Sequence, residues 1–451
     1  MQPQIVLERM KAIDREIWRL TLPSIVTNIT VPLLGLCDVT VMGHVGGATH
    51  IGAIAVGSMI FNVMYWLFGF LRMGTSGLTA QAYGRQSVSG GDGSQPSTSD
   101  ILQGSLLSAL LLGVAIVVLQ VPLQLLTFWL MQPTPDVGAL CTPYYYTCVW
   151  GAPAVLGLYA LTGWLVGMQD TRLPMLIAIG QNVVNILASL LLVLVFHLGV
   201  QGVALGTLIA QWAGFAFAVG CILRSNKLKV AGHWRLKFGA RLFTSHFSLL
   251  TNGRVYLEIF LRTVCLVAVN LYFTSAGAVQ GAEILAANTL LMQLFTLFSY
   301  VMDGLAFSGE ALVGKSYGAA DQRQLHHTVG HLFAWGGGVA ALFTAAYWIG
   351  GTAFLGLLTS DAQVVDTAAA YLPWAVLIPV AGTAAFVWDG VFIGITATRG
   401  MLWACLVAAV CFFAIYLLLS PSLHNHALWL ALIVYLAVRG IVQTVYFRSL
   451  N

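Results

Sequence analysis

Residues 186–196, ILASLLLVLVF, are apolar at every position except Ser189. A membrane-spanning β-strand alternates apolar and polar residues over about ten positions, and this run does not alternate. It lies inside a longer apolar segment, residues 173–197. Because a spanning helix needs about 20 predominantly apolar residues, the segment predicts a membrane-spanning helix.

The composition extends this prediction to the whole chain. The protein has 451 residues, of which 59% are hydrophobic and only 8% are charged. An ordinary soluble domain carries about 25% charged residues, so these charges cannot cover a water-facing surface. A soluble enzyme, a disordered chain and a disulfide-stapled secreted module are therefore excluded. We expect an all-α integral membrane protein with twelve spans, at residues 17–42, 52–82, 101–130, 138–167, 173–197, 199–223, 244–274, 281–313, 324–357, 366–396, 400–420 and 425–447.

Lysine and arginine are distributed unevenly over the predicted loops. The loops after the first, third, fifth, seventh, ninth and eleventh spans contain neither residue. Cytoplasmic loops carry the excess of Lys and Arg in membrane proteins. The pattern therefore predicts that both termini are cytoplasmic. The basic side comprises Arg9, Lys11, Arg15, Arg85, Arg172, the cluster Arg224–Arg241, Lys315, Arg323, Arg399 and Arg448.

Three short motifs occur twice, at nearly constant spacing and at equivalent places in the two halves. The pairs are Ser24–Asn28 with Ser248–Asn252, Tyr83-Gly84 with Tyr317-Gly318, and Gly163–Arg172 with Gly390–Arg399. We expect an N-terminal lobe of six helices that holds a cation-coupling site (1–223), a basic cytoplasmic linker (224–243) and a C-terminal lobe of six helices (244–451). An even number of spans per repeat predicts two lobes of the same orientation, as in transporters with paired halves.

Several charges fall inside the predicted spans, where a central charge costs about 2.5–3.5 kcal/mol on insertion scales. Such residues pair, face water or stay protonated. They are therefore candidates for function. The acids are Asp38, Glu258, Asp303, Glu310 and Asp389, and the main cations are Arg72, Arg254 and Arg262.

Asp38 differs from the other acids because no Lys or Arg lies within one helical turn of it. The repeat spacing makes Arg262 its counterpart in the other half. We therefore expect Asp38 to exchange a proton as water access changes; the alternative is a protonated carboxyl that hydrogen-bonds a neighbouring helix. Pro32 in the same helix predicts a bend. We expect protonation of Asp38 to change that bend.

The acids of the C-terminal half are predicted to form a charged network. Glu258 and Arg262 lie one helical turn apart, so they can pair within one helix. Asp303 and Glu310 share a face of the next helix, and Asp389 lies two helices later. A structural ion network and a second coupling site both fit this pattern, with Arg262 expected to pair with one of the acids.

Two motifs suggest other chemistry but stand in the wrong context. Residues 309–316, GEALVGKS, match the phosphate-loop pattern, which requires a strand before it and a helix after it; here the motif ends a long apolar helix. His326, His327 and His331 could include a metal-binding pair, but an interfacial role is expected because no carboxylate or cysteine cluster accompanies them. We expect no enzyme, no metal site and no nucleic-acid partner.

The resemblance to a known family rests on five stretches. They are CDVTVMGHVGG (37–47), NGRVYLEIFLRT (252–263), VMDGLAFSGEALVGKSYGA (301–319), WDGVFIG (388–394) and HNHALWLAL (424–432). The chain resembles the DinF branch of the MATE multidrug-efflux family over essentially its whole length. The resemblance implies a MATE/MOP-like fold and a multi-pass protein of the bacterial inner membrane, expected to work as a monomer. It also implies an antiporter that exports amphipathic, often cationic compounds in exchange for protons or, in some relatives, Na⁺.

The resemblance also implies site residues. The family's coupling acid falls on Asp38, and its companions fall on Asn185 and Thr207, with Asn182 one turn before Asn185. The family commonly has an Asp at the position of Ser189. Since Na⁺ prefers full compensating charge, the loss of this carboxylate favours H⁺ as the coupling ion.

A substrate cavity is expected in the N-terminal lobe. Aromatic faces and amide groups suit planar amphipaths, although each residue taken alone is more often a helix-packing residue than a substrate contact. The candidates are Asn28, Phe61, Asn62, Tyr65 and Gln211, together with Asn182. The alternative function is a lipid-linked precursor flippase of the same superfamily, which would need a cationic cavity. No cofactor is expected beyond the ion gradient.

Overall fold

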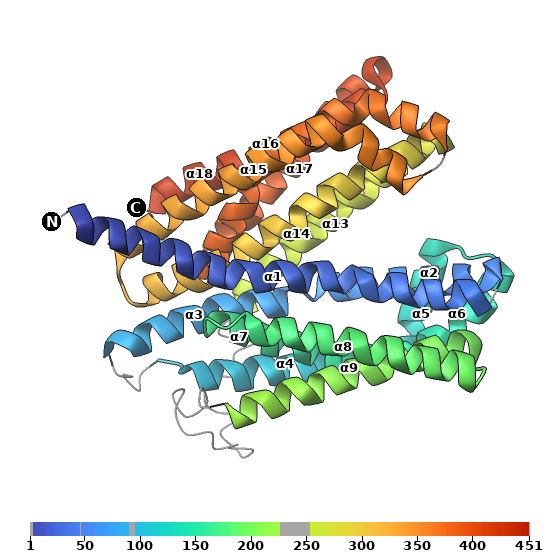
Figure 1. The fold of residues 1–451 in the computed structure, drawn as a ribbon, viewed down its shortest axis with the longest axis horizontal. Helices are drawn as coiled ribbons and strands as arrows, with labels where there is room; N and C mark the ends of the chain where they lie inside the picture. The colour runs from blue at the N-terminus through green and yellow to red at the C-terminus, as the bar shows by residue number, and fades with distance from the viewer. Residues whose placement is uncertain (1–2, 46, 90–94, 226–252, 360, 451) are drawn as a thin grey trace. The chain divides into compact units, whose positions relative to one another are not determined.

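Helices make up nearly all of the chain in the computed structural model (Figure 1). The structure describes residues 3–45, 47–89, 95–225, 253–359 and 361–450, without the side chains of 3–9, 31–34, 36–37, 43–45, 48 and 89. The elements of the first half are α1 (Pro3–Val45), α2 (Ala48–Leu67), α3 (Phe70–Ser89), α4 (Thr98–Val118), α5 (Gln120–Met131), α6 (Pro135–Cys148), a 3₁₀ turn (Val149–Gly151), α7 (Ala152–Gly167), α8 (Arg172–Leu190), a π-helical turn (Leu191–Val195) and α9 (Gly199–Arg224). Those of the second half are α13 (Gly253–Val279), α14 (Ala282–Gly318), α15 (Gln322–Leu358), α16 (Ala362–Gly394), α17 (Thr398–Leu423) and α18 (Asn425–Leu450).

Eleven helical segments of the described chain are long and apolar enough to cross a membrane. The expected first span, 17–42, lies within α1, which is continuous from Pro3 to Val45. The predicted all-helical membrane architecture is thus confirmed. The phosphate-loop motif lies in α14, which remains helical to Gly318. Its backbone N–H groups are therefore committed to the helix.

Three expected spans are each built from two helices. Segment 101–130 breaks at Leu119, and segment 138–167 breaks at Val149–Gly151. Proline explains both breaks, because its ring clashes with the carbonyl four residues earlier and it has no N–H to donate. Pro122 acts in this way on Val118, the last residue of α4, and Pro153 acts on Val149. Segment 52–82 breaks between α2 and α3 at residues 68–69.

The chain divides into two compact units. Unit 1 contains Met1–Ile25 and Leu257–Asn451, and unit 2 contains Val26–Tyr256. Helix α1 therefore begins in unit 1 and continues into unit 2, whereas α13 begins in unit 2 and continues into unit 1. Most of the expected linker, 224–243, lies outside the described residues, so the predicted lobe boundaries stay a prediction.

The repeated motif Gly163–Arg172 and Gly390–Arg399 folds in the same way in both units. Each copy ends its helix at a residue of positive φ, Gln169 at 63° and Thr396 at 54°. The next N–H closes the helix end by a bond to a carbonyl five residues earlier, and both bonds are 2.9 Å long. This is the Schellman arrangement of a helix C-terminus. The sequence repeat is therefore also a structural repeat.

The glycines of this motif bring helices together. A Cβ at Gly163 would lie 2.3 Å from the carbonyl oxygen of Arg72 on α3, and one at Gly390 would lie 2.4 Å from that of Ala306 on α14. Small residues allow membrane helices to pack backbone against backbone. The pairs α3–α7 and α14–α16 are thus matching close contacts of the two units.

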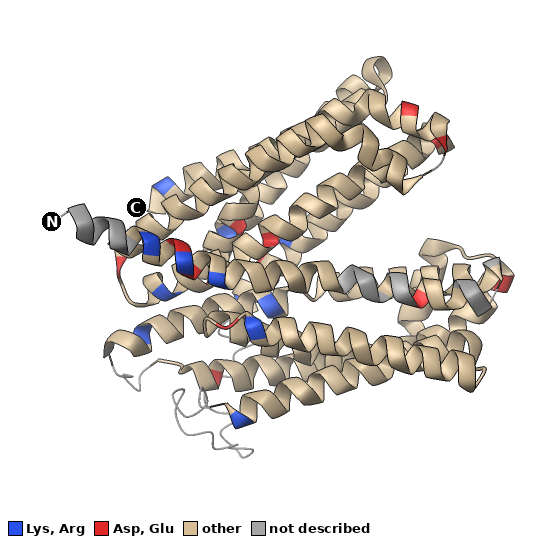
Figure 2. Ribbon diagram, viewed as in Figure 1, with Lys and Arg blue, Asp and Glu red and all other residues tan. Residues whose placement is uncertain are grey.

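Basic residues are concentrated at one end of unit 2 (Figure 2). Lys and Arg lie toward the end where α9 terminates, and none is seen among the described residues at the opposite end, where α8 meets α9. In unit 1 a mixed group of acidic and basic residues lies in the middle of the helices. The first residues of α1 and the end of α18 lie at the same end of that unit (Figure 1).

Candidate functional site

Among the described residues, each unit contains a buried polar cluster around a carboxyl group. In unit 2 the carboxyl belongs to Asp38, which is 2% exposed. The Thr207 hydroxyl of α9 donates to its Oδ2 at 3.2 Å, and the Asn185 side-chain amide of α8 donates to that hydroxyl at 3.0 Å. The three residues form a chain of hydrogen bonds from α8 through α9 to α1.

The Asp38 cluster has unused acceptor capacity. Asp38 Oδ1, Asn185 Oδ1 and Ser189 Oγ are buried and have no hydrogen-bond partner among the described residues. Ser189 lies on α8, one turn after Asn185, close enough to the Asp38 carboxyl to interact with it. The described residues place no Lys or Arg in contact with Asp38. The carboxyl therefore lies among neutral polar groups that can receive or relay a proton.

Helix α6 adds two residues to this environment that the sequence did not single out. Tyr144 and Cys148 are buried within electrostatic range of Asp38. The Tyr144 hydroxyl lies 3.2 Å from Ser58 Oγ on α2, and the Cys148 thiol donates to the Ala204 carbonyl at 3.8 Å. The segment 143–149, PYYYTCV, carries no periodic polar signal, so these positions could be found only in three dimensions.

The predicted cavity residues occupy different environments. Phe61, Tyr65 and Gln211 are buried, whereas Asn62 is exposed and Asn28 is half-buried. The Phe61 ring lies 5.7 Å from that of Tyr65, and it stacks on Tyr145 at 5.4 Å. The Tyr65 hydroxyl and Gln211 Oε1 lack hydrogen-bond partners among the described residues. Phe61 and Tyr65 thus belong to one aromatic group of α2 and α6.

Asn182 does not join the Asp38 cluster, because its amide donates to the backbone carbonyl of Thr30 on α1 at 2.6 Å. It therefore joins α8 to α1 about two turns before Asp38. The Pro32 side chain lies outside the described residues, so bending of α1 at this position stays a prediction.

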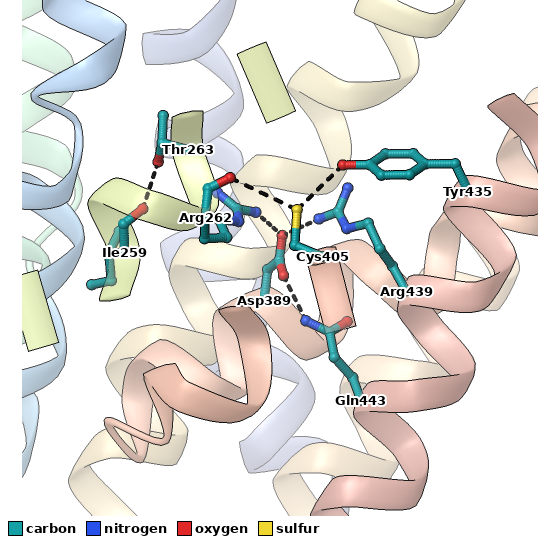
Figure 3. Close-up of polar contacts among 8 residues, drawn as sticks. All are labelled: Ile259, Arg262, Thr263, Asp389, Cys405, Tyr435, Arg439 and Gln443. Atoms are coloured by element: carbon teal, nitrogen blue, oxygen red, sulfur yellow. Dashed lines mark hydrogen bonds and ion pairs between the residues drawn. The ribbon is translucent and has the colours of Figure 1, made fainter. Parts of the chain in front are cut away.

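The cluster of unit 1 is centred on Asp389 of α16 (Figure 3). Its Oδ2 accepts hydrogen bonds from Arg262 of α13 and, at 2.6 Å, from Arg439 of α18. Its Oδ1 accepts from the Gln443 amide at 2.8 Å. The four side chains are buried. Both arginines form ion pairs with the same carboxylate oxygen.

Arg439 and Gln443 were not among the expected network residues. They lie one turn apart on α18, so the spacing within the apolar stretch LAVRGIVQT was the available signal. The other expected members contact different groups. Glu258 accepts from the Thr398 hydroxyl at 2.5 Å, Asp303 is half-buried and Glu310 is 1% exposed. The acid that forms ion pairs with both Arg262 and Arg439 is Asp389.

Two of the histidines of α15 make hydrogen bonds, one to α1 and one within their own helix. His331 Nδ1 bonds Asp14 of α1 at 2.7 Å, and His326 Nδ1 bonds the carbonyl of Gln322. Among the described residues no group of three His, Cys, Asp or Glu side chains could hold a metal ion.

An α-helical membrane protein with a buried acidic cluster in each of two repeated units is the architecture of a secondary transporter. The MatE family model matches residues 23–191 and again residues 255–418, once in each half of the sequence. The chain belongs to the MatE family, which makes it a transporter and not an enzyme, and the resemblance stated from the sequence motifs is confirmed.

Individual relatives agree with this assignment. The chain is 37% identical over 443 residues to DNA damage-inducible protein F of Escherichia coli strain K12, covering 96% of this chain and 92% of that protein. It is 25% identical over 310 residues to human multidrug and toxin extrusion protein 1, covering 67% of this chain and 50% of the human protein.

Solved structures show the same fold. A MATE protein crystallised in a bent conformation has a TM-score of 0.84 at 19% identity and covers 97% of this chain and 95% of its own. The Vibrio cholerae MATE transporter VcmN in its bent form has a TM-score of 0.83 at 16% identity, with coverage of 98% and 97%. The predicted MATE-like fold is thus confirmed.

Proposed function

We propose that this protein is an antiporter that exports amphipathic, often cationic organic compounds in exchange for protons by alternating access. Asp38 is the proton carrier. The observation that carries the proposal is the environment of Asp38, which is 2% exposed. Among the described residues, its Oδ1 has no hydrogen-bond partner, and its carboxyl contacts only neutral polar groups. A buried charge without a basic partner is costly, so binding and release of a proton follow changes in water access.

The neighbours of Asp38 support H⁺ over Na⁺. Thr207, Asn185 and Ser189 are neutral, so the cluster holds a single negative charge among the described residues. Hydroxyl groups both donate and accept hydrogen bonds, which suits either protonation state of the carboxyl. In contrast, Asp389 is enclosed by two guanidinium groups and an amide, which supports a structural role for the acid of unit 1.

The proposed substrate class follows from the family and from the aromatic group of unit 2. Relatives are named for multidrug resistance and toxin extrusion, which favours efflux over the lipid-linked precursor flippase. Phe61, Tyr65 and Tyr145 form a buried aromatic group, and aromatic ring faces attract organic cations. We further propose a monomer in the bacterial inner membrane with both termini cytoplasmic, supported by the distribution of Lys and Arg.

The deciding experiment uses proteoliposomes with an imposed pH gradient and a fluorescent organic cation. Wild-type protein is expected to move the cation against its gradient, and Asp38→Asn to abolish this movement while retaining the fold. Asp136→Asn is the matched control, because Asp136 is an exposed acid of the same unit. A Na⁺ gradient at equal pH on both sides tests the other ion. Full proton-driven transport by Asp38→Asn would show the proposal to be wrong.

A further inference from the structure

Two of the seven cysteines of the chain lie side by side in unit 1. Cys265 lies at the middle of α13, and Cys405 lies on α17. The Cys265 thiol donates to the backbone carbonyl of Cys405 at 3.6 Å, and the two thiol groups are close enough to interact with each other. Both cysteines are free. Cysteines that sense oxidants commonly have a second thiol beside them, with which they form a disulfide.

The helices that carry the two thiols also pack together further along. The Tyr272 ring of α13 packs edge-on against the Phe412 ring of α17, with ring centres 6.1 Å apart, and against the Phe413 ring at 4.9 Å. Tyr272 and Phe412 each lie seven residues after the cysteine of their own helix. The two helices therefore run side by side in the same direction, and their packing at two levels holds the cysteines opposite each other.

The surroundings of the two thiols are electropositive. Arg262 and Arg439 lie within electrostatic range of both sulfur atoms. The Cys405 sulfur lies 3.7 Å from the backbone carbonyl oxygen of Arg262 and 3.4 Å from the Tyr435 hydroxyl (Figure 3). The thiolate is the form of cysteine that attacks an oxidant, and neighbouring positive charge stabilises it. A cysteine pair beside two guanidinium groups is thus suited to reaction, whereas cysteines in purely apolar surroundings are inert.

We propose that Cys265 and Cys405 form a redox-active pair that a hydroperoxide oxidises to a disulfide between α13 and α17. Cys265 is half-buried whereas Cys405 is 1% exposed, so Cys265 reacts with the peroxide first. Its sulfur attacks the terminal peroxide oxygen, an S–O bond forms, the O–O bond breaks, and the other oxygen takes the thiol proton and leaves as water or an alcohol.

The second step joins the two helices. The Cys405 sulfur attacks the sulfenic sulfur of Cys265, an S–S bond forms, the S–O bond breaks, and the hydroxide takes the second thiol proton and leaves as water. The two sulfurs together lose the two electrons that the peroxide gains. The hydroperoxide can be hydrogen peroxide from the water or an apolar hydroperoxide from the bilayer, and the position of Cys265 halfway along a candidate membrane span favours the second source.

Thiol counting on the purified full-length protein in liposomes tests the proposal, and no transport is needed. One sample is treated with hydrogen peroxide and another with cumene hydroperoxide, and both are then denatured and labelled with a maleimide reagent. Wild type is expected to lose two of its seven labels, and dithiothreitol to restore both. Cys265→Ser is expected to keep all of its labels. Loss with cumene hydroperoxide alone identifies an oxidant that arrives from the bilayer, and loss with hydrogen peroxide identifies one from the water.

Cys405→Ser separates the two steps, because oxidation of Cys265 should then stop at the sulfenic acid, which dimedone traps. Cys411→Ser is the matched control, since Cys411 is a half-buried cysteine of the same helix; this variant should lose two labels like wild type. Peptide mapping by mass spectrometry is expected to place the new bond between Cys265 and Cys405. No loss of labels with either peroxide, a disulfide between other cysteines, or unchanged loss in Cys265→Ser would overturn the proposal. If a serine variant fails to fold, the peptide map of oxidised wild type decides.

Discussion

At the scale of single residues, Gly206 determines how closely α9 approaches α8 beside Asp38. A Cβ at this position would lie 2.3 Å from Ser189 Oγ and 2.8 Å from the Ser189 backbone nitrogen. The backbone atom cannot rotate away as a flexible side chain could. Glycine here therefore places the Ser189 hydroxyl next to the carboxyl of Asp38.

Gly206→Ala is expected to separate α8 from α9 and to impair proton-driven transport. Overpacking of this kind costs about 1–3 kcal/mol, so the free energy of unfolding in detergent should fall by that amount. Gly220→Ala on the same helix is the control, because no atom lies within 4 Å of a Cβ built there. The control should be neutral or more stable by up to about 1 kcal/mol, since Ala favours helix over Gly. Equal stability and transport in both variants would contradict this reading of Gly206.

The sequence singled out Asp38 because charge is rare in this chain, and rarity makes a buried acid conspicuous. Thr207 and Asn185 required the family resemblance, since hydroxyl and amide residues are common in membrane helices. Tyr144 could not be predicted, because an aromatic residue in an apolar helix has no distinguishing pattern until the neighbouring helices are placed.

At the scale of elements, the N-terminal part of α1 is fastened to the helices of unit 1. Asp14 accepts from His331 Nδ1 at 2.7 Å and from the Trp335 indole at 2.8 Å, both on α15. Trp18 packs edge-on against Trp335 with ring centres 5.0 Å apart. Thr21 donates to Ser308 of α14 at 3.2 Å. The helix that carries Asp38 in unit 2 is thus anchored at its beginning in unit 1.

Asp14→Ala is expected to weaken this anchor in a pH-dependent way. Burial tends to raise the pKa of Asp14, but the hydrogen bonds from Trp335 and His331 and the charge of His331 lower it overall from its ordinary value of 3.8. The anchor's contribution is therefore complete above pH 3.8 and is lost as the pH falls through the folded-state pKa. At neutral pH the variant should be less stable by about 1 kcal/mol, a figure discounted for the partial exposure of Asp14.

Unfolding followed by tryptophan fluorescence measures this difference, with Arg15→Ala as an exposed control on the same helix. If wild type remains more stable than Asp14→Ala by the same amount well below pH 3.8, ionised Asp14 is not the source of the stability difference.

The sequence predicted an interfacial role for His331, but its partner is 317 positions away and could not be read from local spacing. Single spans were expected at 101–130 and 138–167, although Pro122 and Pro153 mark a break in each.

At the scale of the whole molecule, the two repeated units carry opposite chemistry at equivalent positions. Asp38 and Arg262 are related by the repeat spacing, and the structure places each in a buried cluster of its own unit. The sequence predicted this exchange of an acid for a base. It could not show that Arg262 pairs with Asp389 rather than with Glu258, because the choice depends on the packing of α13 against α16 and α18. Among the described residues, the hydrogen-bond partners of Asp38 lie in unit 2, and those of Asp389 lie in unit 1.

Because the two clusters share no partner among the residues that the structure describes, their substitutions should affect stability independently. Asp389→Asn removes the carboxylate that pairs with two buried arginines and should cost about 3–5 kcal/mol of unfolding free energy. Arg439→Gln leaves a one-to-one pair of Arg262 and Asp389 and should cost less. Combining Asp38→Asn with Arg439→Gln should give the sum of the single effects within about 0.5 kcal/mol. A larger deviation in denaturant unfolding would show that the two clusters are energetically coupled. The Asp389 cluster would then have to be included in any account of ion coupling at Asp38.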